Sequence, residues 1–391
     1  MILAPDEEFL QYSGRIDFED PKNPEFVFPC SSVHLHFFAN GGPLRVRVTN
    51  KRDYWDNYLG YILDQEQGKI RLQDEPVPQT YTICEELQPG EHQLLLFKRQ
   101  DSCHTFTLHG FEIGSGQRSV PDSECLSGCP GSSKQGGEIN PGQGNFPDEK
   151  DEGVQSADVQ ILPCPPKSER RIEFYGDSVS AGEVSEAVDY MGKPDPEWHK
   201  GELSNSWYSY AWLTARKLHA EIHDIAQGGI SLLDGIGWFG VPEYVGMESV
   251  YDKIQYNPAL GVVKNWDFSR YCPQAVVIAV GQNDSNPYDF MREDYEGAQA
   301  VNWRERYGAF IQKLRSIYPE AEIVLATTIL QHDPGWDRAI EEVCQTLDDL
   351  QVHHFLYEKN GAGTPGHIRI PEAERMAEEL AAFLESVVRV W

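Results

Sequence analysis

The pattern of apolar residues changes once along this chain, near residue 170, and this change limits most strongly what the chain can fold into. Before it, short runs alternate between apolar and polar residues, which is the period of a β-strand with one buried face. After it, short apolar runs alternate with longer stretches of helical period, as in parallel sheets. The sequence therefore predicts two domains of different fold class, for which 391 residues give enough length.

The N-terminal part predicts an all-β sandwich. Alternating runs at 33–38, 44–48, 92–97 and 105–108 are separated by turn sequences such as Asn40-Gly41-Gly42-Pro43. Beyond them, Gly, Ser, Pro and charged residues dominate, which is typical of irregular chain. We therefore predict a β-sandwich domain over 1–115 and an irregular linker over 116–168.

The C-terminal part, 169–391, predicts an α/β domain with a doubly wound parallel sheet. Strands separated by helices run parallel, with helices covering both faces of the sheet. The expected strands are 172–175, 221–226, 274–280, 322–326 and 352–357, and the expected helices are 207–219, 303–318, 336–350 and 371–388.

Charge and composition exclude several kinds of partner. The chain has 33 Lys and Arg against 62 Asp and Glu, a net charge of −29, which repels phosphate backbones and anionic lipid surfaces. No apolar run approaches the roughly 20 residues that cross a bilayer. We therefore expect neither nucleic acid nor a membrane as a partner, and favour a neutral, polar substrate.

The N-terminal sequence bears on localisation. Met1 to Glu8 has neither the basic region nor the apolar region of a signal peptide, which predicts a cytoplasmic protein. A secreted protein whose signal had already been removed would begin in a similar way, so a secreted mature form stays open.

Three of the eight cysteines lie in or near the predicted linker. Cys125 and Cys129, with Cys164 further along, are compatible with a local disulfide or with part of a metal site. Structural zinc takes four ligands, and no other Cys or His lies nearby to complete the set. We therefore expect no metal and no cofactor, and interpret the five remaining cysteines as ordinary thiols.

Four residues that suit acyl transfer follow the predicted strands of the α/β domain. Ser178 follows the first strand, Gly229 the second and Asn283 the third, and His367 lies downstream of the fifth. Each alone is common in turns and loops, but the carboxyl ends of parallel strands meet at one edge of the sheet. Together they predict a nucleophile, Ser178, and its base, His367. The N–H groups of Ser178 and Gly229 and the side-chain amide of Asn283 would form the oxyanion hole.

These four blocks resemble the SGNH (GDSL-type) hydrolases, which carry Ser, Gly, Asn and His in this chain order. The match rests on Gly176-Asp177-Ser178, on Gly229, on Gly281-Gln282-Asn283-Asp284 and on His367. The resemblance implies a flavodoxin-like sheet and serine catalysis without a metal.

Features of the N-terminal half are similar to those of carbohydrate esterase family two. They include Lys98-Arg99, Gly110-Phe111-Glu112 and the run Glu173-Phe174-Tyr175 before the serine block. This resemblance implies a jelly-roll domain joined to an SGNH domain. It also implies an esterase that removes O-acetyl groups from plant polysaccharides of the xylan or mannan class, with an acetylated carbohydrate as its partner.

Two other functions remain open. The SGNH scaffold hosts many acyl substrates, so a lipase or thioesterase is one alternative. A carbohydrate-binding protein without catalysis is the other, although the joint presence of Ser178, Asn283 and His367 speaks against it.

Aromatic residues near the blocks could stack on a sugar ring. Of Trp207, Tyr208, Trp238, Phe239 and Trp336, we select Trp238 as the substrate-binding candidate because it follows the second block closely.

The group that orients His367 departs from the family pattern. The usual triad places Asp three residues before the histidine, where this chain has Thr364. Members of the esterase family that this chain resembles work as a Ser-His dyad in which a backbone carbonyl orients the ring. We therefore expect a carbonyl of the 363–366 loop to do so, with the Thr364 hydroxyl as the alternative, and expect Asp177 and Asp284 to be structural.

Overall fold

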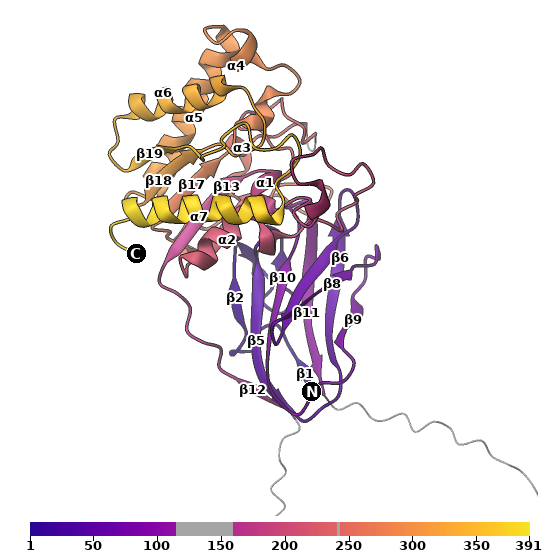
Figure 1. Ribbon diagram of the computed structural model, residues 1–391. Helices are drawn as coiled ribbons and strands as arrows, with labels where there is room; N and C mark the ends of the chain where they lie inside the picture. Colours follow the sequence, from indigo (N-terminus) through magenta and orange to yellow (C-terminus); the bar gives the residue numbers. More distant parts are fainter. Residues whose placement is uncertain (115–158, 241–242) are drawn as a thin grey trace, which may run out of the picture.

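The computed structural model describes residues 1–114, 159–240 and 243–391. It contains two domains, an antiparallel β-sandwich and an α/β domain, and the ends of the sandwich strands lie against the α/β domain (Figure 1). The predicted fold class is confirmed for both domains.

The sandwich consists of two six-stranded sheets whose strand pairs are all antiparallel. One sheet has the order β3-β4-β11-β6-β9 with β1 on β11, and the other has the order β12-β5-β10-β7-β8 with β2 on β5. The strands are β1 (Ile2–Leu3), β2 (Gln11–Ser13), β3 (Ile16–Asp17), β4 (Glu25–Phe26), β5 (Ser32–Ala39), β6 (Leu44–Arg52), β7 (Tyr58–Leu63), β8 (Glu66–Arg71), β9 (Gln79–Cys84), β10 (Gly90–Lys98), β11 (His104–Ile113) and β12 (Val159–Leu162).

The prediction of an irregular linker over 116–168 is wrong near the C-terminal end of that segment. Residues 159–162 were assigned to the linker 116–168, but they form β12, which pairs with β5 at the edge of the sandwich. Val159 and Ile161 pair with Ala39 and Phe37, so this short segment adds apolar side chains to the sandwich core. The composition of the surrounding chain hid a four-residue strand. Cys125 and Cys129 lie outside the described residues.

The α/β domain is built on a five-stranded parallel sheet of order β14-β13-β17-β18-β19. Apolar residues of α2 and α7 pack on one face, and those of α5 and α6 pack on the other. A small antiparallel ladder, β15-β16, lies apart from the sheet. The strands are β13 (Arg171–Gly176), β14 (Glu221–Ala226), β15 (Lys253–Gln255), β16 (Lys264–Asn265), β17 (Ala275–Ala279), β18 (Glu322–Ala326) and β19 (Val352–Phe355). The helices are α1 (Ser178–Ala181), α2 (Tyr210–Lys217), α3 (Met247–Val250), α4 (Phe290–Glu293), α5 (Ala298–Ile317), α6 (Pro334–Leu347) and α7 (Ile370–Val387), with short 3₁₀ turns η1 (Val188–Tyr190), η2 (Ser206–Tyr208), η3 (Phe268–Arg270) and η4 (Gln282–Ser285).

The two domains share their cores. Val27, Phe28 and Cys103 of the sandwich pack in the same apolar cluster as residues of the α/β sheet. Arg15 of the sandwich is fully buried, and its Nη2 lies 3.5 Å from Oε2 of Glu173, which is fully buried on β13. Removing one partner of a buried ion pair leaves an uncompensated charge, so the two domains stabilise each other.

Six cysteines in the described part of the chain have free thiols. Five of them were interpreted as ordinary thiols, namely Cys30, Cys84, Cys103, Cys272 and Cys344, and the sixth is Cys164. Among the described helices, none has both the length and the apolar character that spanning a membrane requires.

Candidate active site

Ser178 begins α1 directly after the first strand of the parallel sheet, β13. Asp177 caps this helix, and its Oδ1 accepts the N–H of Val179 at 2.9 Å. The first N–H groups of a helix have no partner within it, and the N–H of Ser178 has none elsewhere among the described residues. Ser178 lines a pocket of about 700 Å³, to which it offers both a hydroxyl and an N–H donor.

Gly229 lies on the same pocket, in the loop that follows β14. Its φ is +74°, and a Cβ at this position would lie 2.8 Å from Cβ of Trp238, so only glycine fits without strain. Its carbonyl accepts the N–H groups of Trp238 and Phe239 at 2.9 and 3.0 Å. Within the described chain its own N–H has no acceptor, which leaves this donor for a ligand.

Asn283 reaches the pocket from η4, after the central strand β17. Its Nδ2 donates to Oδ2 of Asp177 and to the carbonyl oxygen of Ile230, each at 3.0 Å. Both amide hydrogens are therefore engaged in this structure. Donation to an oxyanion requires that one of these hydrogen bonds be shared or exchanged.

His367, the predicted base, lies next to the predicted nucleophile, Ser178. Its Nε2 lies 2.8 Å from Oγ of Ser178, which is hydrogen-bond distance. On the opposite side of the ring, Nδ1 lies 2.5 Å from Oδ2 of Asp195. This is the arrangement of a nucleophile, a base and a carboxylate that orients the base.

Asp195 corrects the prediction for the orienting group. The ring nitrogen expected to meet a carbonyl of the 363–366 loop meets a carboxylate 172 residues away in the chain instead. Thr364 is fully buried, and its hydroxyl makes no hydrogen bond to the ring or to any other described residue. The prediction failed because Asp195 is far from His367 in the sequence, in the long connection between β13 and β14, and no motif marks it. One signal was present, because Asp195 stands between two prolines, Pro194 and Pro196, which stiffen the loop around it.

Asp195 is held in place from several sides. Its Oδ1 accepts the backbone N–H of His367 at 2.9 Å and Nη2 of Arg369 at 2.6 Å. A Cβ on Gly366 would lie 2.8 Å from this oxygen, so a glycine is needed there for the loops to approach. Burial alone would raise the pKa of Asp195, but the hydrogen bonds and charges of His367 and Arg369 lower this pKa well below its ordinary value.

The pKa of His367 is shifted in the opposite direction to that of Asp195. Burial alone would lower the pKa of its imidazole, but the carboxylates of Glu183 and Asp195 outweigh burial and raise the pKa of His367 to about 9. The ring is therefore protonated at neutral pH before substrate binds, and a neutral base forms as the pH rises.

The two other acidic residues of the blocks are structural, as expected. Asp177 accepts hydrogen bonds from Val179, Gln282 and Asn283. Asp284 accepts the N–H groups of Leu232 and Leu233 at 2.7 and 3.1 Å. These carboxylates connect the loops of the site to one another.

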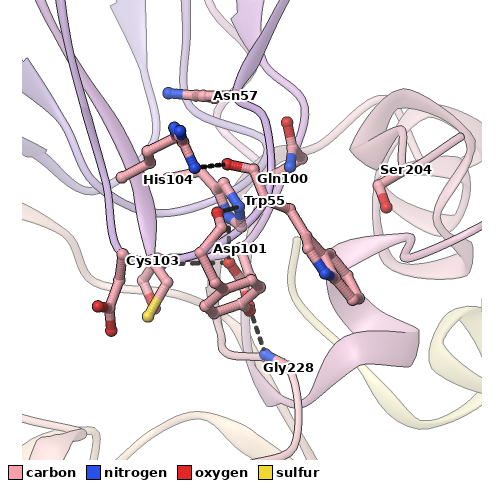
Figure 2. A network of polar contacts seen from close by, with 12 residues as sticks. Trp55, Asn57, Gln100, Asp101, Cys103, His104, Ser204 and Gly228 are labelled. Atoms are coloured by element: carbon pink, nitrogen blue, oxygen red, sulfur yellow. Dashed lines mark hydrogen bonds and ion pairs between the residues drawn. The ribbon is translucent and has the colours of Figure 1, made fainter. Parts of the chain in front are cut away.

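The sandwich domain also contributes to the pocket, through Tyr54 and Trp55. Behind them, the buried carboxylate of Asp101 accepts the N–H of Gly228 at 2.8 Å (Figure 2). It also accepts hydrogen bonds from the side-chain amide of Gln227 at 2.6 Å and from the Tyr54 hydroxyl at 2.5 Å. Burial alone would raise the pKa of Asp101, but its contacts with His104, Tyr54 and Lys98 lower this pKa to about 2. Sequence patterns within one domain carry no signal for such contacts between domains.

Of the aromatic candidates, Trp238 suits substrate binding best. Its side chain lines the pocket and is 69% exposed. Trp336 is fully buried and packs against Phe290 and Trp303. Trp207 and Tyr208 do not line this pocket, and Phe239 lines it but is buried.

Within residues 1–114, 159–240 and 243–391, no group of three or more His, Cys, Asp or Glu side chains is arranged to hold a metal ion.

Comparison with known proteins connects this site to a family. Residues 12–122 match the family model for the N-terminal domain of carbohydrate esterase 2. The chain is similar to the family two carbohydrate esterases. A structure of a family two carbohydrate esterase from Clostridium thermocellum, solved in complex with cellohexaose, superimposes with a TM-score of 0.70 at 25% identity, covering 96% of this chain and 98% of that one.

Two relatives carry names that describe this chemistry. The cellulase/esterase CelE of Acetivibrio thermocellus is 27% identical over 405 residues, which cover 98% of this chain and 40% of that protein. The acetylxylan esterase / glucomannan deacetylase of Cellvibrio japonicus is 26% identical over 234 residues, 59% of this chain and 60% of that protein. The chain thus spans less than two thirds of the length of each of these two relatives. The family two likeness covers both domains, sandwich and SGNH-type sheet.

Proposed function

We propose that this protein is a serine esterase that removes O-acetyl groups from plant-type oligosaccharides or polysaccharides of the xylan or mannan class. The observation that carries the proposal is the hydrogen bond of 2.8 Å between Ser178 Oγ and His367 Nε2, made inside an open pocket with Asp195 on the far side of the ring. The names of the family two relatives support the acetyl group and the carbohydrate.

The reaction proceeds through an acetyl-enzyme. Neutral His367 takes the proton of Ser178 as Oγ attacks the acetyl carbonyl carbon. The negative oxygen of the tetrahedral intermediate accepts the N–H groups of Ser178 and Gly229, with Asn283 as a third donor. His367 then gives its proton to the sugar oxygen, the bond between carbonyl carbon and sugar oxygen breaks, and the free sugar leaves. Water attacks the acetyl-serine by the same route, which releases acetate and regenerates Ser178.

Asp195 supports both proton transfers. It accepts the Nδ1–H of His367, so Nε2 is the nitrogen that faces Ser178 as the proton acceptor. The negative charge of Asp195 also stabilises the imidazolium that forms in the transition state.

The shape of the site favours a sugar over a lipid acyl chain. Trp238 offers an exposed indole at the rim, which suits stacking on the apolar face of a sugar ring. Beyond Trp238 the cleft continues into a second hollow of about 750 Å³, lined by polar residues that include Asp289, Gln331 and Asp333. An oligosaccharide could extend into this hollow, whereas a fatty acyl chain requires an apolar tunnel.

A comparison of three esters separates the candidate functions. 4-Nitrophenyl acetate, butyrate and octanoate should be hydrolysed with kcat/KM falling steeply as the acyl chain lengthens, and acetylated xylan or mannan oligosaccharides should release acetate. Faster hydrolysis of the octanoate would favour a lipase or thioesterase. Absence of hydrolysis together with oligosaccharide binding would show a carbohydrate-binding protein.

A further inference from the structure

The carboxylate of Glu183 lies in the active-site pocket, and the mechanism above does not use it. Oε2 of Glu183 is 3.9 Å from Nε2 of His367, the ring nitrogen that faces Ser178. Asp195 occupies the other ring nitrogen and orients the base. Glu183 therefore faces the place where the substrate must lie, on the side of the ring that exchanges protons.

The backbone places Glu183 in this position at a conformational cost. Gly182, whose φ is +74°, caps the C-terminal end of α1, and the N–H of Glu183 donates to the carbonyl oxygen of Ser178 at 2.9 Å. The next residue, Val184, has a φ of +54°, a conformation that β-branched residues rarely adopt. Its N–H donates to Oγ of Ser204 at 3.2 Å, which holds the turn. Such conformations persist where the surrounding structure imposes them, and they cluster at functional sites.

No described residue donates a hydrogen bond to the carboxylate of Glu183. Its side chain is 16% exposed, and no hydrogen bond to it is made within the described residues. Its Oε2 lies against Gly228, where a Cβ would come within 2.9 Å of that oxygen. Burial, with the nearby carboxylates, raises the pKa of Glu183 to about 7, although His367 opposes this shift. A partly buried carboxylate that accepts no hydrogen bond is available to a donor on a ligand.

The chemistry of the substrate supplies such a donor. During catalysis, Nε2–H of His367 must reach the ester oxygen of the leaving sugar within hydrogen-bond distance. A hydroxyl on a neighbouring position of the same sugar lies about one hydrogen-bond length further on. An acceptor 3.9 Å from Nε2 is within reach of that hydroxyl.

We propose that Glu183 is a specificity residue that accepts a hydrogen bond from a free sugar hydroxyl next to the acetyl ester, and so selects partly acetylated sugar residues. This inference rests on the proposed esterase function. It adds the feature of the substrate that the site recognises, which is a free hydroxyl next to the ester. A site that is built to hydrogen-bond a hydroxyl discriminates strongly against an analogue without it, because its own polar group is then buried without a partner.

The test compares two substrates that differ only in the donor. One is a monoacetylated methyl glycoside of xylose or mannose that the protein deacetylates, with its other hydroxyls free. The other is the same monoacetate with those hydroxyls converted to methyl ethers, which accept but cannot donate. The measured quantity is the ratio of kcat/KM for the first substrate to that for the second. This ratio cancels any effect on the pKa of His367, because both substrates use the same base.

Wild-type protein should prefer the free-hydroxyl substrate, and Glu183→Leu should reduce this preference by about tenfold to a hundredfold, as expected for a hydrogen bond to a charged group. Glu183→Gln should keep part of it, because the amide oxygen still accepts. Asp189→Asn, which removes an exposed charge from the same segment outside the pocket, is the matched control and should keep the wild-type ratio.

The outcomes distinguish failure of the specificity role from failure of the proposed function. If Glu183→Leu keeps the wild-type ratio while both substrates are hydrolysed, the specificity role is wrong and the esterase function stands. If Asp189→Asn lowers the ratio as much as Glu183→Leu does, the effect is one of net charge, which also overturns the proposal. If wild-type protein releases acetate from neither glycoside, the proposed function itself fails.

Discussion

The carboxylate of Asp101 accepts the backbone N–H of Gly228 at 2.8 Å, although Asp101 belongs to the sandwich and Gly228 to the α/β domain. Gly228 precedes Gly229, whose N–H is a proposed oxyanion donor. The sandwich thereby fixes the loop that carries this donor, and it is part of the active-site architecture rather than an appended module.

Asp101→Asn should lower kcat for 4-nitrophenyl acetate by about ten- to a hundredfold with a small change in KM, because a misplaced donor weakens transition-state binding alone. Affinity for a boronic acid, which forms a tetrahedral adduct with the serine, should fall by a similar factor. Glu75→Gln, an exposed residue of the same domain, is the control. A change in KM alone, or loss of thermal stability with unchanged kcat in the folded fraction, would contradict this role.

Asp195 and Thr364 give opposite expectations for the group that orients His367. Asp195→Asn should lower kcat by up to about 10⁴-fold, the cost of losing the orienting carboxylate in a triad. Thr364→Ala should change kcat by less than about tenfold, because its hydroxyl is buried and makes no hydrogen bond to the ring or to any other described residue. Rates for both variants are measured on an acetyl ester at a pH above the imidazole pKa. If Asp195→Asn left kcat unchanged and Thr364→Ala lowered it strongly, Thr364 rather than Asp195 would be the group that orients His367.

The pH dependence of kcat/KM should follow the titration of His367. Its pKa is raised to about 9, and the imidazole must be neutral to accept the serine proton. We therefore expect kcat/KM to rise with pH and to become level above about 9. Glu183→Gln removes a negative charge that stabilises the imidazolium, so the pKa of His367 should fall and the level region should begin at lower pH. A wild-type profile already level at about pH 7 would contradict this account of His367.

Asn283→Ala should lower kcat by about 10²- to 10³-fold with little change in KM, the usual cost of one oxyanion donor. In the structure the Asn283 amide also donates to Asp177 and to the carbonyl of Ile230, so stability is measured in parallel by thermal unfolding. An effect confined to KM would show that Asn283 binds substrate instead.

Much of the site was predictable from the sequence because the carboxyl ends of parallel strands meet. Ser178, Gly229 and Asn283 each follow a strand of the sheet, and with His367 they line one pocket. This convergence follows from fold class, and fold class follows from the alternation of strands and helices.

The remaining parts were not predictable for two physical reasons. Asp195 comes from the irregular segment between η1 and η2, which has no helical or strand periodicity, so no pattern places its side chain. Tyr54, Trp55 and Asp101 reach the site because two domains pack together, and neither domain's sequence encodes that packing locally. The strand β12 was missed because it is short and follows a segment with the composition of a linker.

The central claim is that Ser178 becomes acetylated during the reaction. Protein mixed with 4-nitrophenyl acetate and quenched rapidly in acid is analysed by mass spectrometry of the intact chain and of its peptides. We expect wild-type protein to gain one acetyl group on Ser178. The Ser180→Ala control should gain it as well, because that serine contacts Tyr210 rather than His367. Ser178→Ala and His367→Ala should show no adduct and lose nearly all activity. An acetyl group on another residue, or Ser178→Ala retaining more than about a tenth of the wild-type rate, would contradict the account.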